Sequence, residues 1–141
     1  MRIAILLLLA ALAVSGCIRQ PDNITQEERA AVYNYAGPIV DSMMAGFNDG
    51  NYTRFSANFG NVLQSFMTED HFHTLVNDTT KELGLYVSKG QVSLEKDNGL
   101  YTLTYVTDWE KKDVVQLSVM FRVDDPYHKV ESFAINSSPG K

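Results

Sequence analysis

Asp108 and Trp109 are neighbouring residues whose types suit acid–base chemistry. A carboxylate beside an indole in an apolar setting can act as a general base, and Tyr105 is a nearby tyrosine that could complete an ionisable pair. The same residues are equally typical of a strand end that reaches water. No nucleophile, partner acid, glycine-rich phosphate loop or Gly-x-Ser-x-Gly motif accompanies them, so the sequence assigns no catalytic residue.

Two segments that contain histidine are candidate metal ligands. His71 and His73 lie two residues apart, and on a helix, the structure expected here, they point about 200° away from each other. Asp124, Asp125 and His128 could hold a cation weakly, but a turn rich in Asp and Pro explains the same residues. The sequence therefore predicts no metal site and no cofactor.

The N-terminus has the pattern of a secretory signal peptide. Arg2 supplies a positive charge, residues 3–14 form an unbroken apolar run, and small residues lead to Cys17. This run of twelve residues extends about 18 Å as a helix, whereas a bilayer core is about 30 Å thick and needs about 20 apolar residues. We therefore expect residues 1–16 to be a cleaved signal peptide rather than a membrane-spanning helix.

The four residues that end this segment, Val14-Ser15-Gly16-Cys17, resemble the lipobox of prokaryotic lipoproteins. The resemblance implies that the Cys17 sulfur is lipidated, with acyl chains such as palmitate, and that Cys17 begins the mature protein. A diacylglyceryl group holds a protein firmly to a bilayer, whereas a single acyl chain binds only marginally. The expected localisation is extracytoplasmic and lipid-anchored to the cell membrane, with residues 17–24 as the tether. Whether the host is bacterial or archaeal stays open.

Composition and charge narrow the class of partner. The 141-residue chain has 12 Lys and Arg against 17 Asp and Glu, which gives a net charge of −5. An acidic chain without a basic stripe is poorly suited to binding nucleic acid or to lying on anionic lipids. A single cysteine cannot form an intramolecular disulfide, so an ordinary apolar core must stabilise the fold. One domain is expected over residues 25–136, followed by a flexible tail over residues 137–141.

The first predicted helix begins at a capping box, in which Thr25 is followed three residues later by Glu28. Apolar residues then recur at helical spacing and predict one buried face. Gly37 and Pro38 interrupt the series, and because proline cannot donate its amide we expect a kink or two helices meeting there. Gly50 is suited to end the helix in the left-handed conformation.

A second apolar series predicts two short helices divided by Gly60; its members are Tyr52, Phe55, Phe59, Val62, Leu63, Phe66 and Met67. Thr68 is expected to cap the following helix, and Gly84 is expected to stop it.

From residue 85 the apolar period changes to two, which is typical of strands. Asp97-Asn98-Gly99 predicts a hairpin, a charged turn follows over residues 110–113, and another turn precedes a last strand over residues 129–136. Helices followed by strands indicate an α+β fold. We expect the N-terminal helices to pack on one face of a curved, four-stranded antiparallel meander sheet.

Residues 44–56, with the sequence Met-Ala-Gly-Phe-Asn-Asp-Gly-Asn-Tyr-Thr-Arg-Phe-Ser, resemble the opening of a small family of secreted prokaryotic domains of unknown function. Aromatic residues and glycines continue the likeness over roughly residues 37–136, although Asn51 stands where an aspartate is usual. That family resembles the nuclear-transport-factor-two-like superfamily, whose cystatin-like sheet wraps helices into a cone. The resemblance implies that ligands enter at the sheet mouth near Tyr105, Asp108 and Trp109. It settles no function, because the superfamily holds both enzymes and binding modules.

Four asparagines fit the glycosylation acceptor pattern Asn-x-Ser/Thr, namely Asn23, Asn51, Asn77 and Asn136. Some could carry sugar in an exported protein of a glycosylating prokaryote. Chance matches, together with the use of Ser and Thr as caps, explain them equally well.

The sequence thus favours a membrane-anchored extracytoplasmic lipoprotein that acts as a non-catalytic binding module for a small ligand or an envelope partner. Two alternatives remain. One is a small cone-fold enzyme of the cyclase, isomerase or dehydratase kind, and the other is a purely structural envelope interaction subunit. The oligomeric state stays open.

Overall fold

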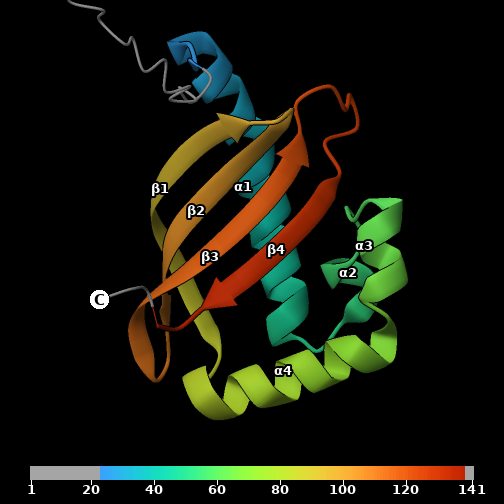
Figure 1. Ribbon diagram of the computed structural model, residues 1–141. Helices are drawn as coiled ribbons and strands as arrows, with labels where there is room; N and C mark the ends of the chain where they lie inside the picture. Colours follow the sequence, from blue (N-terminus) through green and yellow to red (C-terminus); the bar gives the residue numbers. More distant parts are fainter. Residues whose placement is uncertain (1–22, 139–141) are drawn as a thin grey trace, which may run out of the picture.

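The computed structural model describes residues 23–138, in which four helices precede a four-stranded sheet (Figure 1). The chain is therefore α+β, as the change of apolar period predicts. The elements in chain order are α1 (Gln26–Asn48), α2 (Tyr52–Phe55), α3 (Asn61–Phe66), α4 (Glu69–Leu83), β1 (Tyr86–Asp97), β2 (Leu100–Trp109), β3 (Lys112–Arg122) and β4 (Val130–Asn136).

Helix α1 is one continuous helix of 23 residues, which corrects the expectation of two helices meeting at Gly37 and Pro38. Its N-terminus is capped as predicted, because the Thr25 hydroxyl accepts a hydrogen bond from the Glu28 amide at 3.0 Å. Pro38 lies on the exposed side of the helix, while a buried stripe runs along the opposite side. Glycine before proline has no Cβ to meet the proline ring, so the backbone at Gly37 can stay helical. The stripe consists of Val32, Ala36, Val40, Met43, Met44, Gly46 and Phe47.

The predicted helix ends are confirmed. Gly50 and Gly84 have φ of 63° and 77°, the left-handed region that glycine adopts without strain. Gly60 is the N-cap of α3 and so divides the second apolar series, and the Thr68 hydroxyl accepts from the His71 amide at 3.3 Å. Each end follows from a local residue, so the sequence was sufficient to find it.

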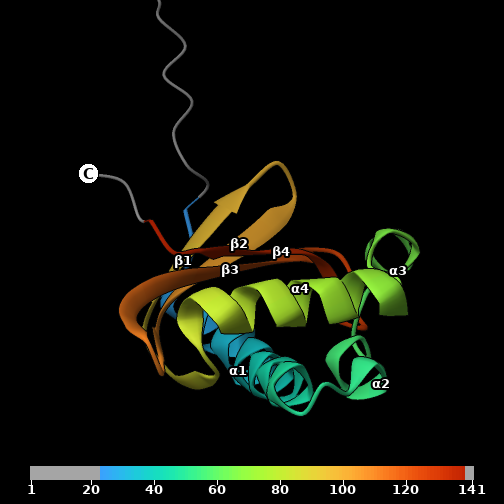
Figure 2. The same ribbon diagram turned by 90° about the horizontal axis from the view of Figure 1, so that it is seen from below.

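The sheet is a meander in the order β1-β2-β3-β4, with every neighbouring pair antiparallel. Asn98 and Gly99 between β1 and β2 have φ of 52° and 75°, the pair of positive values that a tight hairpin of this sequence requires. Helices α1 and α4 lie on the same side of the sheet (Figure 2). The β2 and β3 side chains alternate accordingly between buried and partly exposed.

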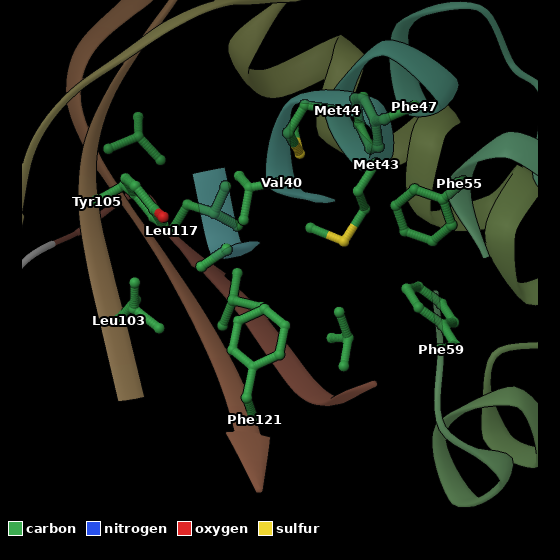
Figure 3. Close-up of a cluster of buried hydrophobic side chains, with 14 of the residues drawn as sticks. Val40, Met43, Met44, Phe47, Phe55, Phe59, Leu103, Tyr105, Leu117 and Phe121 are labelled. Carbon is green, nitrogen blue, oxygen red and sulfur yellow. The ribbon is translucent and has the colours of Figure 1, made fainter. Parts of the chain in front are cut away.

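The core forms where the buried stripe of α1 meets the inner face of the sheet (Figure 3). Leu103, Leu117 and Phe121 from the sheet are completely buried against it. An aromatic cluster extends the core toward the other helices: Phe55 lies 4.7 Å from Phe72 and 5.5 Å from Phe133 between ring centroids. Two members of the second apolar series do not join it, because Val62 and Phe66 of α3 are 60% and 71% exposed.

Polar contacts fasten the edge strand β1 to α1. The Lys96 ammonium donates to the Glu28 carboxylate at 2.7 Å, and the Tyr101 hydroxyl donates to the same carboxylate oxygen. Further along, Lys89 pairs with Asp41. These lysines therefore point to the helix side of the sheet, where carboxylates of α1 pair with their charges.

Replacing Glu28 by Gln should reduce the decrease in the free energy of unfolding that accompanies acidification. The hydrogen bond from Lys96, followed by that from Tyr101, lowers the pKa of Glu28 below its ordinary value of 4.5. A lowered carboxyl pKa contributes stability that is present above pH 4.5 and is lost as the pH falls through the folded-state value. Chemical denaturation of wild type and Glu28→Gln from pH 7 downward measures the difference. Glu27→Gln removes an exposed carboxylate outside this network and is the control; equal slopes for wild type and Glu28→Gln would contradict the assignment.

Gly46→Ala should destabilise the fold by about 1–3 kcal/mol, as overpacking does. A Cβ at Gly46 would lie 2.4 Å from the Phe55 backbone nitrogen, so α1 and α2 could no longer approach as they do. Helix propensity alone acts in the opposite direction and favours alanine by about 1 kcal/mol. Thermal unfolding followed by circular dichroism decides between them, and a stabilised variant would show that the close approach is unimportant.

Candidate functional site

The structure does not bring the three sequence candidates together. Tyr105 and Trp109 are buried on the inner face of β2, at 3% and 2% exposure, whereas Asp108 points to the outer face and is exposed. The Asp108 carboxylate accepts only a long contact of 3.5 Å from the Ser88 hydroxyl. Burial raises the pKa of Tyr105 to about 12, so that phenol stays protonated at neutral pH. These residues supply no carboxylate–indole site.

Trp109 has a structural partner instead. Its Nε1 donates to the Thr107 hydroxyl at 2.9 Å, and that hydroxyl donates to the Val115 carbonyl at 2.6 Å. All these groups are buried between β2, β3 and α1, where an unpaired polar atom is costly. The indole is therefore oriented by a relay to the neighbouring strand and is unavailable to a ligand.

The histidines also have local roles. His71 Nδ1 lies 2.7 Å from the Phe66 carbonyl, and His73 Nε2 lies 3.7 Å from the Glu69 carboxylate one turn away. In the turn before β4, His128 stacks on Tyr35 with ring centroids 3.8 Å apart. Within residues 23–138, no three His, Cys, Asp or Glu side chains gather in a way that could hold a metal ion.

Asp125 organises the turn in which His128 lies. Its carboxylate accepts the Lys129 and Tyr127 amides at 2.8 and 2.9 Å, and these bonds lower the Asp125 pKa. The structure therefore uses this residue as a turn-forming group, as the Asp- and Pro-rich sequence suggests.

All four acceptor asparagines are exposed. Asn51 caps α2 by accepting the Arg54 amide at 3.0 Å, and Asn136 accepts the Ser138 amide at 3.0 Å. Both contacts use the side-chain oxygen rather than the nitrogen to which sugar is attached. Glycosylation stays a prediction.

Several predictions fall outside the described residues. These are the signal peptide over residues 1–16, lipidation at Cys17, most of the tether over residues 17–24 and the end of the tail over residues 137–141. The structure begins just before Ile24, which packs against the core. Among the residues described, no helix is long and apolar enough to cross a bilayer.

A groove that the sequence did not reveal lies between α3, α4 and the second half of β4. It encloses about 460 Å³, within the usual range for ligand pockets. Its walls are mainly apolar, with carboxylates and hydroxyls on one side. The lining residues are Leu63, Met67, Leu75, Asp78, Thr79, Glu82, Leu83, Phe133, Ala134, Ile135 and Ser137.

The groove stays open because few large side chains fill it. Helix α3 buries no residue, and α4 fully buries only Phe72 and Leu83. Leu75 is half-buried and packs at the margin of the core. We name this cavity the α4–β4 groove. The sequence indicates this groove only weakly. Phe133 and Ile135 lie on the inner face of the edge strand β4, which one helix only partly covers.

The charge of the α4–β4 groove is negative. Asp78 and Glu82 lie one helical turn apart on α4, and both line the cavity. Glu82 accepts a hydrogen bond from the Ser137 hydroxyl at 2.7 Å. Neither carboxylate has a Lys, Arg or His within ion-pair distance in the part of the chain that is described. The groove thus combines apolar walls with two carboxylates that lack a counter-ion.

Comparison of the chain with models of protein families, with curated proteins and with solved structures found no match. The arrangement of side chains therefore carries the functional argument by itself.

Thr107→Val should destabilise the protein by about 1–3 kcal/mol, because the Trp109 indole N–H would be left buried and unpaired. The chain has a single tryptophan, so its fluorescence should also shift in the folded state. Denaturant titration followed by that fluorescence measures both effects. Asp108→Asn, one residue further along the same strand, is the control and should change the free energy of unfolding by less than about 0.5 kcal/mol. A large effect of Asp108→Asn together with a silent Thr107→Val would reverse the assignment.

Proposed function

We propose that this protein is a lipid-anchored extracytoplasmic binding module without catalytic activity, and that the α4–β4 groove is its binding site. The groove carries the proposal: it is of ligand size, mainly apolar, and has polar groups along one side. Its two carboxylates lie on one helix, and Glu82 accepts a hydrogen bond from the Ser137 hydroxyl that lines the same cavity.

The finer fold assignment belongs to the same proposal. We infer that the curved sheet and its helices correspond to the cone of the nuclear-transport-factor-two-like superfamily, with the α4–β4 groove as the opening of the cone. The resemblance of residues 44–56 supports this inference. In the structure these residues contain the close approach of Gly46 to Phe55, which fixes how α1 leads into α2.

The arrangement of the elements suits an anchored receptor. Helix α1 begins at one end of the molecule, whereas α4 lies at the other end (Figure 1). Eight residues lie between Cys17 and Gln26, and the nine steps from one to the other span about 30 Å even when fully extended. The end that holds the start of α1 therefore stays close to the bilayer. The α4–β4 groove is lined by α4 and so lies toward the opposite end of the molecule.

The anchor is tested by intact mass measurement of the native protein extracted from its membrane. The expected species begins at Cys17 and carries a diacylglyceryl group, and Cys17→Ser should remove the acyl mass and release the protein from the membrane fraction. Asn51→Gln is a control that can change glycan mass but leaves the acyl mass in place. Native protein found in the cytosol, beginning at Met1 and free of acyl chains, would overturn the proposed localisation.

The groove is tested by filling it. Leu75→Trp places a large side chain into the cavity and should abolish the thermal stabilisation caused by ligands found in a metabolite and peptide screen. Val62→Trp lies on the exposed side of α3, outside the cavity lining, and is the matched control. Ligands that stabilise wild type and Leu75→Trp equally would place binding elsewhere, and reproducible turnover of any compound would overturn the non-catalytic assignment.

A further inference from the structure

The two edge strands of the sheet differ in how they are protected from pairing with another chain. Edge strands commonly carry bulges and lysines that discourage such pairing. β1 has both: its pairing with β2 shifts register between Tyr86 and Ser88 and again between Lys89 and Val92, and Lys96 is a second lysine along the strand. β1 is therefore a poor template for an added strand.

β4 lacks these protections over its second half. At its start the outer side is occupied, because the Gly60 amide donates to the Val130 carbonyl and the Val130 amide donates to the Asn58 carbonyl. From Ser132 to Asn136, β4 pairs with β3 in a regular register. This stretch of β4 contains no proline, lysine or arginine. Apart from β3, these residues have no backbone partner in the described part of the chain. This stretch presents free backbone groups.

The α4–β4 groove lies directly beneath that free edge. Phe133 and Ile135 point from β4 into it, and Leu63, Met67 and Leu75 form the opposite walls. An extended peptide that adds to a sheet edge places alternate side chains on one face of the sheet. Every second residue of a strand added to β4 would thus enter the groove, where apolar side chains fit.

The negative charge of the α4–β4 groove indicates which kind of added strand it would bind. Asp78 and Glu82 line the groove and have no ion-pair partner within residues 23–138, and the whole chain has a net charge of −5. A second copy of this chain would bring the same carboxylates to the contact and would be repelled. A basic segment would neutralise them. Two nearby lysines have other partners: the Lys112 ammonium donates to the Ser137 carbonyl and the Lys111 ammonium to the Lys81 carbonyl, and neither lysine lines the cavity.

We propose that the α4–β4 groove and the free edge of β4 together form a docking site for an extended segment of a partner protein whose groove-facing side chains, at every second position, include both apolar and basic residues. The segment adds to β4 as a fifth strand, places its apolar side chains against the apolar walls of the groove, and directs a lysine or arginine on the same face toward Asp78 and Glu82. This inference rests on the proposed binding function and specifies the class of partner.

The test uses the mature lipidated protein in detergent and three labelled eight-residue peptides, with binding measured by fluorescence anisotropy. The first peptide has valine and lysine in turn at every second position with threonine at the positions between, the second carries glutamate in place of lysine, and the third is the lysine peptide with every amide N-methylated. The lysine peptide should bind best. The N-methylated peptide keeps the charge and the apolar side chains but cannot donate strand hydrogen bonds, so it should bind at least about tenfold more weakly.

Two double variants of the protein test whether the carboxylates of the groove contribute to peptide binding. Asp78→Asn/Glu82→Gln should weaken the lysine peptide about tenfold, while Glu95→Gln/Asp108→Asn, which changes the net charge equally on exposed positions elsewhere, should have little effect. Equal binding of the lysine and glutamate peptides, or of the N-methylated peptide, would overturn the strand-addition inference and leave the binding function standing.

Failure of the proposed function has a different signature. If Leu75→Trp changes the binding of no peptide and of no compound from the screen, the groove is not the binding site. A stable dimer that Leu75→Trp dissociates would assign the groove to a second copy of this chain and would also overturn the inference.

Discussion

The packing of α1 across the inner face of the sheet is the interaction on which the other features depend. One helix supplies the whole buried stripe, and Ala36, Val40 and Phe47 within it are completely buried. Phe47 meets Trp109 edge to face at 5.6 Å, which joins the end of α1 to the end of β2. Because one helix covers this much of the sheet, the remaining helices are left to close one corner of the fold, and they close it incompletely.

The elements were predictable because local chemistry determines where they begin and end. Thr25 and Thr68 cap helices, Gly50 and Gly84 end them, and Gly99 turns a hairpin, each through a contact or a dihedral angle of its own neighbourhood. The continuity of α1 through Pro38 was not predictable in this way, because the sheet holds both halves of the helix against one surface. The exposure of Val62 and Phe66 likewise depends on where α3 is placed by its neighbours, which periodicity alone does not determine.

The candidate site, like the fold, was predictable from the sequence only in part. The alternation of buried and exposed residues along β2 already implied that Asp108 and Trp109 face opposite sides, so the sequence held the information against their pairing. The α4–β4 groove required the relative placement of three elements distant in sequence, and no motif marks it. Lipidation at Cys17 stays a prediction, because it would depend on recognition by other proteins of the host and Cys17 lies outside the described residues.

The Asn48 side chain has a consequence for how the molecule moves. Its amide accepts the Tyr86 N–H at 2.9 Å and donates to the Tyr86 carbonyl at 2.7 Å, so it pairs with β1 as a strand residue would. The chain between these two residues, which contains α2, α3 and α4, is thereby closed into a long loop at its base. We expect a loop closed in this way to open as a cooperative unit of its own in hydrogen exchange, as contiguous segments of folded proteins do. The cavity walls on its helices can then move apart to admit a chain at far less cost than global unfolding.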